Sequence, residues 1–248
     1  EDAIDYAEKR GIKLTVTKEK IYSRDQNLWH ISHEGGDIEQ LENEHNEEVL
    51  YMMVTPPERA KDTPTYVDIT FEKGWPVKVD GESLSPATLL QKLNKIAGEN
   101  GVGVADIVEN RIVGMKSRGI YETPGGTLLM ESLMELETIV FDKDTLNFKK
   151  LVSQKYAEIA YNGQWFTPIK YALDAFVDSI DEVLTGTIKL KLYKGHIKIA
   201  GRFTENALYD EGISSFGSSE LYSHKDAEGF IKLFSLPNTI RAYKKLSK

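Results

Sequence analysis

The residues best suited to binding a polar ligand lie within residues 101–127. Residues 106–109 read as a short apolar strand that ends in the carboxylate of Glu109. Three cations follow in a loop that contains glycines, namely Arg111, Lys116 and Arg118, and the phenol of Tyr121 comes after Gly119. A turn is predicted at residues 124–126. A carboxylate, a phenol and cations in one loop suit a zwitterionic ligand, because they offer partners to both of its charges. The same residue types also fit a salt-bridged loop around a buried tyrosine, and both interpretations stay open on these residues alone.

A second polar region is strongly acidic. No Lys or Arg occurs between Arg24 and Arg59, and the carboxylates in that gap include Glu34, Asp37, Glu39, Glu42, Glu44, Glu47 and Glu48. Such a charge run predicts a solvated acidic loop. His30, His33 and His45 lie in or beside it, but their spacing fits no compact metal-binding motif.

Composition excludes several classes of protein. The chain has 248 residues, of which 40% are hydrophobic, enough for one large or two modest domains. A net charge of -8 argues against a nucleic-acid partner. The absence of cysteine excludes disulfides, cysteine-ligated zinc and thiol catalysis, and it fits a reducing, cytoplasmic compartment. No apolar run approaches the roughly 20 residues that a membrane-spanning helix needs, so no membrane partner is expected.

The elements that must position these residues follow an α+β pattern. Val67, Ile69 and Phe71 alternate with polar residues as in a half-buried strand, and residues 77–79 form a returning strand. Ser85 and Pro86 predict a helix start. An apolar stripe at helical spacing then runs to a stop predicted at Gly98. Further helices are predicted at residues 127–141, 145–161 and from 168 through 180, and a hairpin at residues 187–193 and 196–202.

The N-terminal segment predicts part of another domain. Residues 3–10 read as a helix, Gly11 as its stop signal and residues 12–17 as a strand. Helix, glycine and strand make half of a βαβ repeat, and a parallel strand needs further strands to pair with. We therefore expect the chain to start in the last αβ unit of a parallel-sheet domain. The alternative is an irregular N-terminal helix on a complete protein.

Several motifs, in the same order along the chain, resemble the argininosuccinate synthase family. The most specific are IVENR at 107–111 and GMKSRGIYETP at 114–124. Others are YSRDQNLWHIS at 22–32, FEKGWPV at 71–77, KYAEIAYNGQWFTP at 155–168, LKLYKG at 190–195, LYDE at 208–211 and AEGFI at 227–231. Two positions depart from the family pattern. Val104-Ala105 stands where the family usually has Arg-Ile, and Gln26 replaces a frequent Glu.

The resemblance implies an ATP-dependent ligase that joins L-citrulline to L-aspartate through a citrullyl-adenylate, with Mg²⁺ accompanying ATP. The family's citrulline contacts fall on Ser23, Ser32, Glu109 and Tyr121. An ion pair of Glu109 with Arg111 or Arg118 is the alternative structural role of that carboxylate. No Ser-Gly-Gly-rich pyrophosphate loop occurs in the sequence, so we expect the chain alone to be inactive.

The same resemblance implies three parts. Residues 1–17 would end the nucleotide-binding domain, which would hold ATP and Mg²⁺. Residues 18–228 would form the synthetase domain, with antiparallel strands, packed helices and the citrulline site. Residues 229–248 would form a helical arm that assembles a homotetramer. The alternative is a non-catalytic fragment that only binds ligand or builds oligomers.

Overall fold

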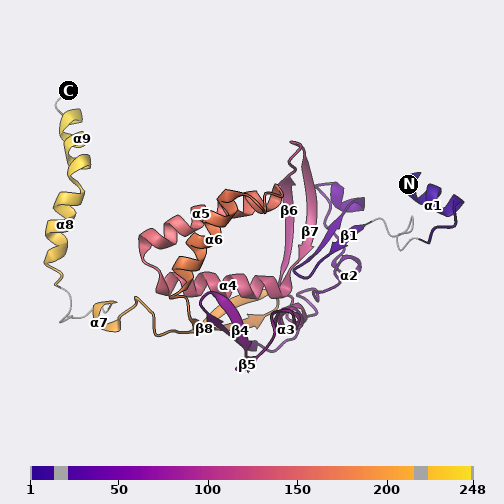
Figure 1. Ribbon diagram of the computed structural model, residues 1–248, viewed down its shortest axis with the longest axis horizontal. Helices are drawn as coiled ribbons and strands as arrows, with labels where there is room; N and C mark the ends of the chain where they lie inside the picture. The colour runs from indigo at the N-terminus through magenta and orange to yellow at the C-terminus, as the bar shows by residue number, and fades with distance from the viewer. Residues whose placement is uncertain (1, 14–21, 215–222, 247–248) are drawn as a thin grey trace. The chain divides into compact units, whose positions relative to one another are not determined.

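The computed structural model describes residues 2–13, 22–214 and 223–246. The chain divides into two compact units, residues 1–206 and 207–248. The first unit contains two antiparallel sheets and the helices that pack on them, which confirms the predicted α+β class (Figure 1). Among the described residues, no helix is both long and apolar enough to cross a bilayer.

The first sheet has four strands in the order β1-β2-β7-β6. They are β1 (Ser23–Gln26), β2 (Ile31–Glu34), β7 (Lys116–Glu122) and β6 (Val104–Asn110), all paired antiparallel. One face packs on a small core of Ile38, Leu50 and Ile120. Ile38 and Leu50 come from two short helices, η1 (Gly36–Glu39) and α2 (Glu47–Leu50). The opposite face is therefore left for polar side chains.

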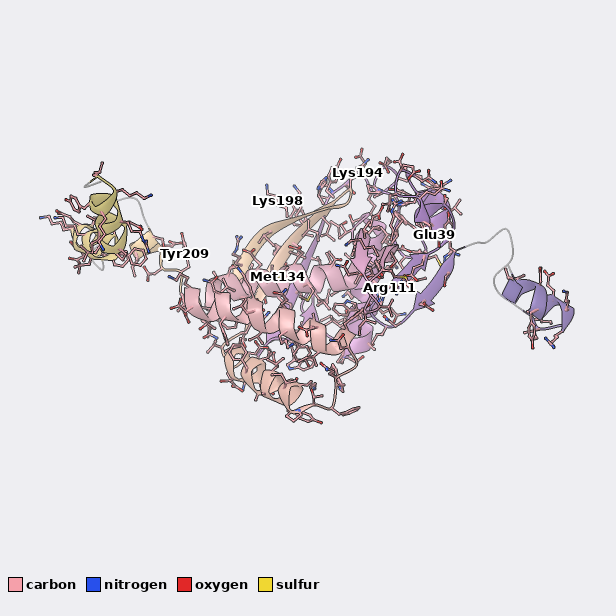
Figure 2. The ribbon with its side chains drawn as sticks, turned by 90° about the horizontal axis from the view of Figure 1, so that it is seen from above. Glu39, Arg111, Met134, Lys194, Lys198 and Tyr209 are labelled. Atoms are coloured by element: carbon pink, nitrogen blue, oxygen red, sulfur yellow. The ribbon has the colours of Figure 1, made fainter. Side chains whose placement is uncertain are left out.

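The second sheet has five strands in the order β5-β4-β3-β8-β9. They are β5 (Glu82–Ser83), β4 (Trp75–Val79), β3 (Thr65–Glu72), β8 (Gly186–Tyr193) and β9 (His196–Phe203). Its hairpins turn on two consecutive residues with positive φ, the second always glycine: Lys73-Gly74, Asp80-Gly81 and Lys194-Gly195. Lys194 marks the β8–β9 turn in Figure 2. Both predicted hairpins are confirmed.

Helices cover the second sheet and carry the main core. α3 (Pro86–Glu99) and α4 (Pro124–Val140) contact each other, and α4 also contacts β8 and β3 (Figure 1). Leu89, Leu93, Leu128 and Leu136 are fully buried there. α5 (Lys143–Tyr161) and α6 (Pro168–Asp181) form a helical hairpin. All four helices fall within a few residues of the predicted ranges.

Three sequence predictions are wrong in detail. α3 passes through Gly98 and ends at Glu99, because the glycine with positive φ after the helix is Gly101 and not Gly98. Gly98 instead leaves room for the Met53 carbonyl, since a Cβ there would lie 2.1 Å from that oxygen. The glycine-punctuated loop around Gly119 is strand β7. The turn predicted at residues 124–126 is the first turn of α4, where proline is suited to the N-terminal position.

The acidic region is also more ordered than the predicted solvated loop. Ile31 and His33 of β2 are buried, and so is Ile38 of η1. Arg118 supplies the missing cation from β7, because one of its nitrogens donates to the carbonyls of Ile38, Gln40 and Asn43. A cation distant in sequence thus orders a segment that has none of its own.

The N-terminal segment and the second unit each contain helices. α1 (Asp2–Lys9) agrees with the predicted helix, whereas the strand predicted at 12–17 lies mostly outside the described residues. The second unit contains α7 (Glu211–Ser214), α8 (Asp226–Phe234) and α9 (Leu236–Leu246). α9 lies within the arm predicted at residues 229–248 and is helical as expected. The domain boundaries at residues 17 and 228 stay predictions.

Candidate ligand-binding site

The four residues predicted to contact a ligand share one face of the first sheet. Ser32 of β2 stands directly opposite Tyr121 of β7. Ser23 pairs with Glu34, two residues beyond Ser32, and so points to the same side. Glu109 lies four residues from Ala105, the β6 partner of Tyr121, and therefore joins this face as well. The face is open to solvent at Ser23 and partly open at Tyr121 and Glu109.

Tyr121 reaches Glu109 by lying across a glycine. A Cβ on Gly119 would lie 2.9 Å from Cε2 of Tyr121 and 3.0 Å from its hydroxyl oxygen, so the ring needs the space that glycine leaves. The Tyr121 hydroxyl donates to Oε1 of Glu109 at 3.1 Å. Burial, together with the hydrogen bond to Glu109, raises the pKa of Tyr121 to about 12. The phenol therefore stays a neutral donor at neutral pH.

Glu109 also faces a cation, as the ion-pair alternative requires. Nε of Arg111 lies 3.6 Å from Oε1 of Glu109, beyond hydrogen-bond length, and donates to Oγ of Ser117 at 2.8 Å. The other end of the guanidinium pairs with Glu34. Arg118 plays no part here, because it binds Asp106 through two nitrogens at 2.9 and 2.6 Å. Glu109 is thus balanced by Arg111 but keeps part of its carboxylate accessible, with 29% of its side chain exposed.

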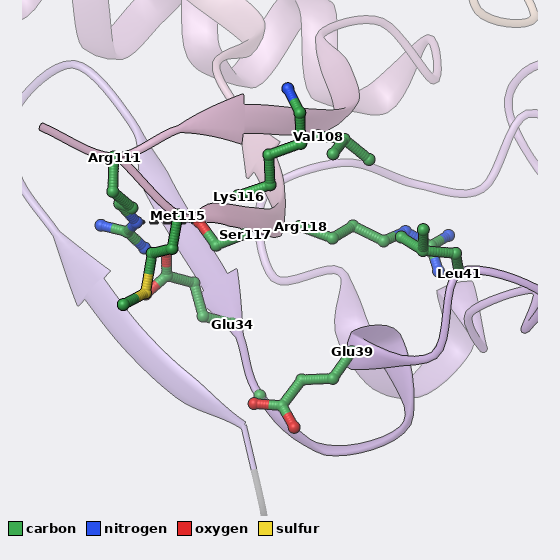
Figure 3. Close-up of a pocket in the computed structure, with 10 residues that line it drawn as sticks. Glu34, Glu39, Leu41, Val108, Arg111, Met115, Lys116, Ser117 and Arg118 are labelled. Carbon is green, nitrogen blue, oxygen red and sulfur yellow. Dashed lines mark hydrogen bonds and ion pairs between the residues drawn. The ribbon is translucent and has the colours of Figure 1, made fainter. Parts of the chain in front are cut away.

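A cavity of about 500 Å³ opens at one end of this sheet, between the β6–β7 hairpin and the chain at and after η1 (Figure 3). It is lined by residues from the β2 end, η1 and the β6–β7 hairpin, including Glu34, Glu39, Leu41, Arg111, Met115 and Ser117. In Figure 3, Arg111 and Glu34 point toward each other, whereas Lys116 points away from them, and its Nζ donates to Oδ1 of Asn110 at 2.7 Å. None of the four predicted ligand residues lines this cavity. The open polar face is therefore the better candidate, because the donors and acceptors meet there.

Comparison with known proteins decides the family. The family model described as arginosuccinate synthase C-terminal domain matches residues 22–241. The chain belongs to the argininosuccinate synthase family. It is 65% identical over 244 residues to the argininosuccinate synthase of Clostridium botulinum strain Langeland, covering 98% of this chain and 61% of that protein. It is 62% identical over 248 residues to that of Clostridium acetobutylicum, covering 100% of this chain and 62% of the relative. The chain thus spans about three fifths of the length of these synthases.

Reading the sequence missed the residues that hold the predicted ones in place. Arg111 was identified as one of the cations that suit a zwitterionic ligand and as a possible ion-pair partner of Glu109, but the links of its guanidinium to Ser117 and Glu34 were not foreseen. His33 and Glu122, directly after Ser32 and Tyr121 of this synthase-family chain, form a buried pair on the opposite face. Strand alternation was the available signal, since residues next to a site-facing residue must point the other way.

Proposed function

We propose that this chain is the citrulline-binding part of an argininosuccinate synthase. The complete polypeptide would join L-citrulline and L-aspartate at the expense of ATP, giving argininosuccinate, AMP and pyrophosphate through a citrullyl-adenylate. It would do so in the cytoplasm as a homotetramer. One observation carries the proposal: Ser23, Ser32, Glu109 and Tyr121, from four different strands, share one face, which is open at Ser23, partly open at Glu109 and Tyr121, and buried at Ser32. Family membership and the identity to named synthases support the same reaction.

The residue types on this face suit a ligand with both charges and a ureido group. The hydroxyls of Ser23 and Ser32 can each donate to a carboxylate or accept from an N–H. Glu109 can accept from an ammonium or from ureido N–H groups in a charge-assisted bond. Tyr121 and Arg111 both act on Oε1 of Glu109, Tyr121 by a hydrogen bond and Arg111 by its charge. These residues would orient the ureido oxygen for attack on the α-phosphorus rather than form a covalent bond.

ATP and Mg²⁺ fit poorly to the part of the chain that the structure describes. Within those residues, no group of three or more His, Asp or Glu side chains could hold a metal ion. The glycine-containing N-terminus of α4 is not a free phosphate cradle either, because the Gly125 N–H already donates to Oδ1 of Asn94 at 2.8 Å. We therefore assign ATP, Mg²⁺ and L-aspartate mainly to sequence that the longer synthases contain and this chain does not.

The alternative is a non-catalytic role, in which the chain binds ligand or assembles oligomers. Pyrophosphate release separates the two. We expect the complete polypeptide to release pyrophosphate only when ATP, citrulline and aspartate are all present, and the isolated chain to release none. Ser32→Ala in the complete polypeptide should lower kcat/KM for citrulline and leave the KM for ATP unchanged. Release that does not depend on citrulline would overturn the proposal, and turnover by the isolated chain would overturn the assignment of ATP.

A further inference from the structure

A polar relay runs beneath the candidate site, on the buried face of the same sheet. His33 and Glu122 are both fully buried, with Nε2 of His33 2.8 Å from Oε1 of Glu122. Nε of Arg24 donates to Nδ1 of His33 at 3.0 Å. A guanidinium has no acceptor, so Nδ1 accepts and Nε2 carries the hydrogen that it donates to Glu122. Arg24, His33 and Glu122 therefore form one directed chain, the relay.

The Glu122 end of the relay is fully satisfied. Its Oε1 accepts from the Met52 N–H at 2.8 Å as well as from His33, and its Oε2 accepts from the Met53 and Val54 N–H groups at 2.7 Å each. Burial raises the pKa of Glu122, but the hydrogen bonds from His33 and the three amides outweigh it and hold the pKa below its ordinary value. An ionised carboxylate with four donors is a fixed anchor, because losing any donor leaves buried charge unpaired.

Each member of the relay is the next residue after a predicted ligand contact. Arg24 follows Ser23, His33 follows Ser32 and Glu122 follows Tyr121. In the β2–β7 register, Ser32 pairs with Tyr121. The two neighbouring pairs are Ile31 with Glu122 and His33 with Ile120. Neighbouring strand residues point to opposite faces, so the relay crosses β1, β2 and β7 directly beneath the three contacts. A one-residue slip between these strands would turn the contacts away from the ligand and break the relay at the same time.

The relay also ties the site to the helical layer. The segment that supplies the three amides continues to Thr55, whose N–H donates to the carbonyl of Gly98 in α3 at 2.9 Å. The Met53 carbonyl lies where a side chain on Gly98 would be. The floor of the site is therefore held against α3 as well as across the strands.

We propose that Arg24, His33 and Glu122 are positioning residues for citrulline, acting through Ser23, Ser32 and Tyr121 without touching the ligand. This inference rests on the proposed function. Its consequence is selective: loss of the relay disturbs the three contacts together, whereas binding of ATP and aspartate, assigned elsewhere, is spared. A relay that only stabilised the fold would not single out one substrate.

The test uses His33 variants of the complete polypeptide. His33→Ala removes both hydrogen bonds of the ring. His33→Gln keeps an amide donor for Glu122 and an oxygen acceptor for Arg24. We expect His33→Ala to raise the KM for citrulline about tenfold or more, since misplacements of an ångström cost up to about 100-fold. The KM values for ATP and aspartate should stay within about twofold, and His33→Gln should recover most of the loss. An unchanged citrulline KM in His33→Ala, or equal rises for all three substrates, overturns the proposal.

Two further variants keep the test decisive. Ile188→Ala, in the fully buried core of the second sheet, is a control that lowers the stability of the fold without changing the relay. It should leave the citrulline KM unchanged. If His33→Ala does not fold, Arg24→Met gives the same test, because Arg24 is only half-buried. Arg24→Met should raise the citrulline KM alone, by about threefold or more. No rise with Arg24→Met, or a selective rise with Ile188→Ala, contradicts the relay.

Tyr121→Phe separates failure of the inference from failure of the proposed function. If Tyr121→Phe raises the citrulline KM but folded His33→Ala does not, only the relay is wrong. If neither variant changes the citrulline KM, the open face is not the citrulline site and the proposed function of this chain is wrong as well. Rises in both variants, with recovery in His33→Gln, support the two proposals together.

Discussion

Gly119 lets the Tyr121 ring reach Glu109, and this gives a residue-scale prediction. Gly119→Ala places a Cβ about 3 Å from the far end of the Tyr121 ring. The flexible ring moves rather than the strand, so we expect the citrulline KM to rise roughly tenfold with little change in melting temperature. Steady-state kinetics and a thermal melt of the complete polypeptide check this. A normal citrulline KM would show that the ring position does not matter for binding.

Asp181 gives a second prediction at this scale, on how the stability of the protein depends on pH. Burial raises the pKa of Asp181 from its ordinary 3.8 to about 6, with Lys149 opposing and Glu137 and Asp178 adding to the rise. A raised carboxyl pKa means that the folded state holds the proton more tightly. Its stabilising contribution is complete below pH 3.8 and is lost as pH rises through about 6.

Asp181→Asn should therefore stabilise the protein at pH 7.5. The full shift is discounted because Asp181 is partly solvated, which leaves about 1 kcal/mol. At pH 4 the variant and the original should have nearly equal free energies of unfolding, measured by urea titration. Equal stability at both pH values would mean that Asp181 titrates normally.

The residue types at the site could be predicted from sequence, but the ion pairs that they form could not. Glu109 and Tyr121 stand close to a strand end and a glycine, so a polar site was predictable there. The separate partners of Arg111 and Arg118 were not, because sequence distance does not tell which face of a strand a cation uses. The strand register determines the face: Arg118 of β7 pairs with Val108 of β6 and therefore points away from Glu109.

At the scale of elements, the cap of α3 is testable. Oγ of Ser85 accepts from the Thr88 N–H, and Pro86 occupies the first turn. Ser85→Ala should lower the free energy of unfolding by about 1 kcal/mol. That corresponds to roughly 2–4 °C in melting temperature for a domain of this size. Ser85→Asn keeps an acceptor and should melt close to the original; a loss equal to that of Ser85→Ala would assign the effect to something other than capping.

Helices and hairpins of the second sheet were predictable because their signals are local. Proline after a cap, apolar stripes and Lys-Gly or Asp-Gly turns determine those elements within a few residues. The predictions failed where a partner distant in sequence decides. Gly98 was predicted to end a helix, but its missing side chain leaves room for the Met53 carbonyl. The β7 segment was predicted to be a loop because of Gly119, but that glycine leaves room for the Tyr121 ring. Close packing of this kind leaves no periodic signal.

At the scale of the whole molecule, the tail offers an assembly prediction. Ile240, Tyr243 and Leu246 of α9 are 51%, 68% and 85% exposed. A short amphipathic helix is rarely stable without packing, so we expect α9 to dock on another subunit of a homotetramer. Deleting residues 238–248 should lower the mass measured by light scattering. Lys245→Ala, which keeps the apolar side chains, should leave the mass unchanged, and an unchanged mass in the deletion would contradict an assembly role.

The central claim is that the open face of the first sheet binds citrulline, and Glu109→Gln tests it most directly. The variant keeps the shape of the side chain but removes its charge. A charge-assisted hydrogen bond contributes about 1.5–3 kcal/mol, so the Kd for citrulline should rise roughly 10- to 150-fold in calorimetric titration of the complete polypeptide.

Asp106→Asn, on the same strand but paired with Arg118 on the opposite face, is the matched control and should leave the citrulline Kd unchanged. ATP affinity without citrulline and the melting temperature of Glu109→Gln should barely move. A normal citrulline Kd with a large loss of thermal stability would instead assign Glu109 to the scaffold and contradict the claim.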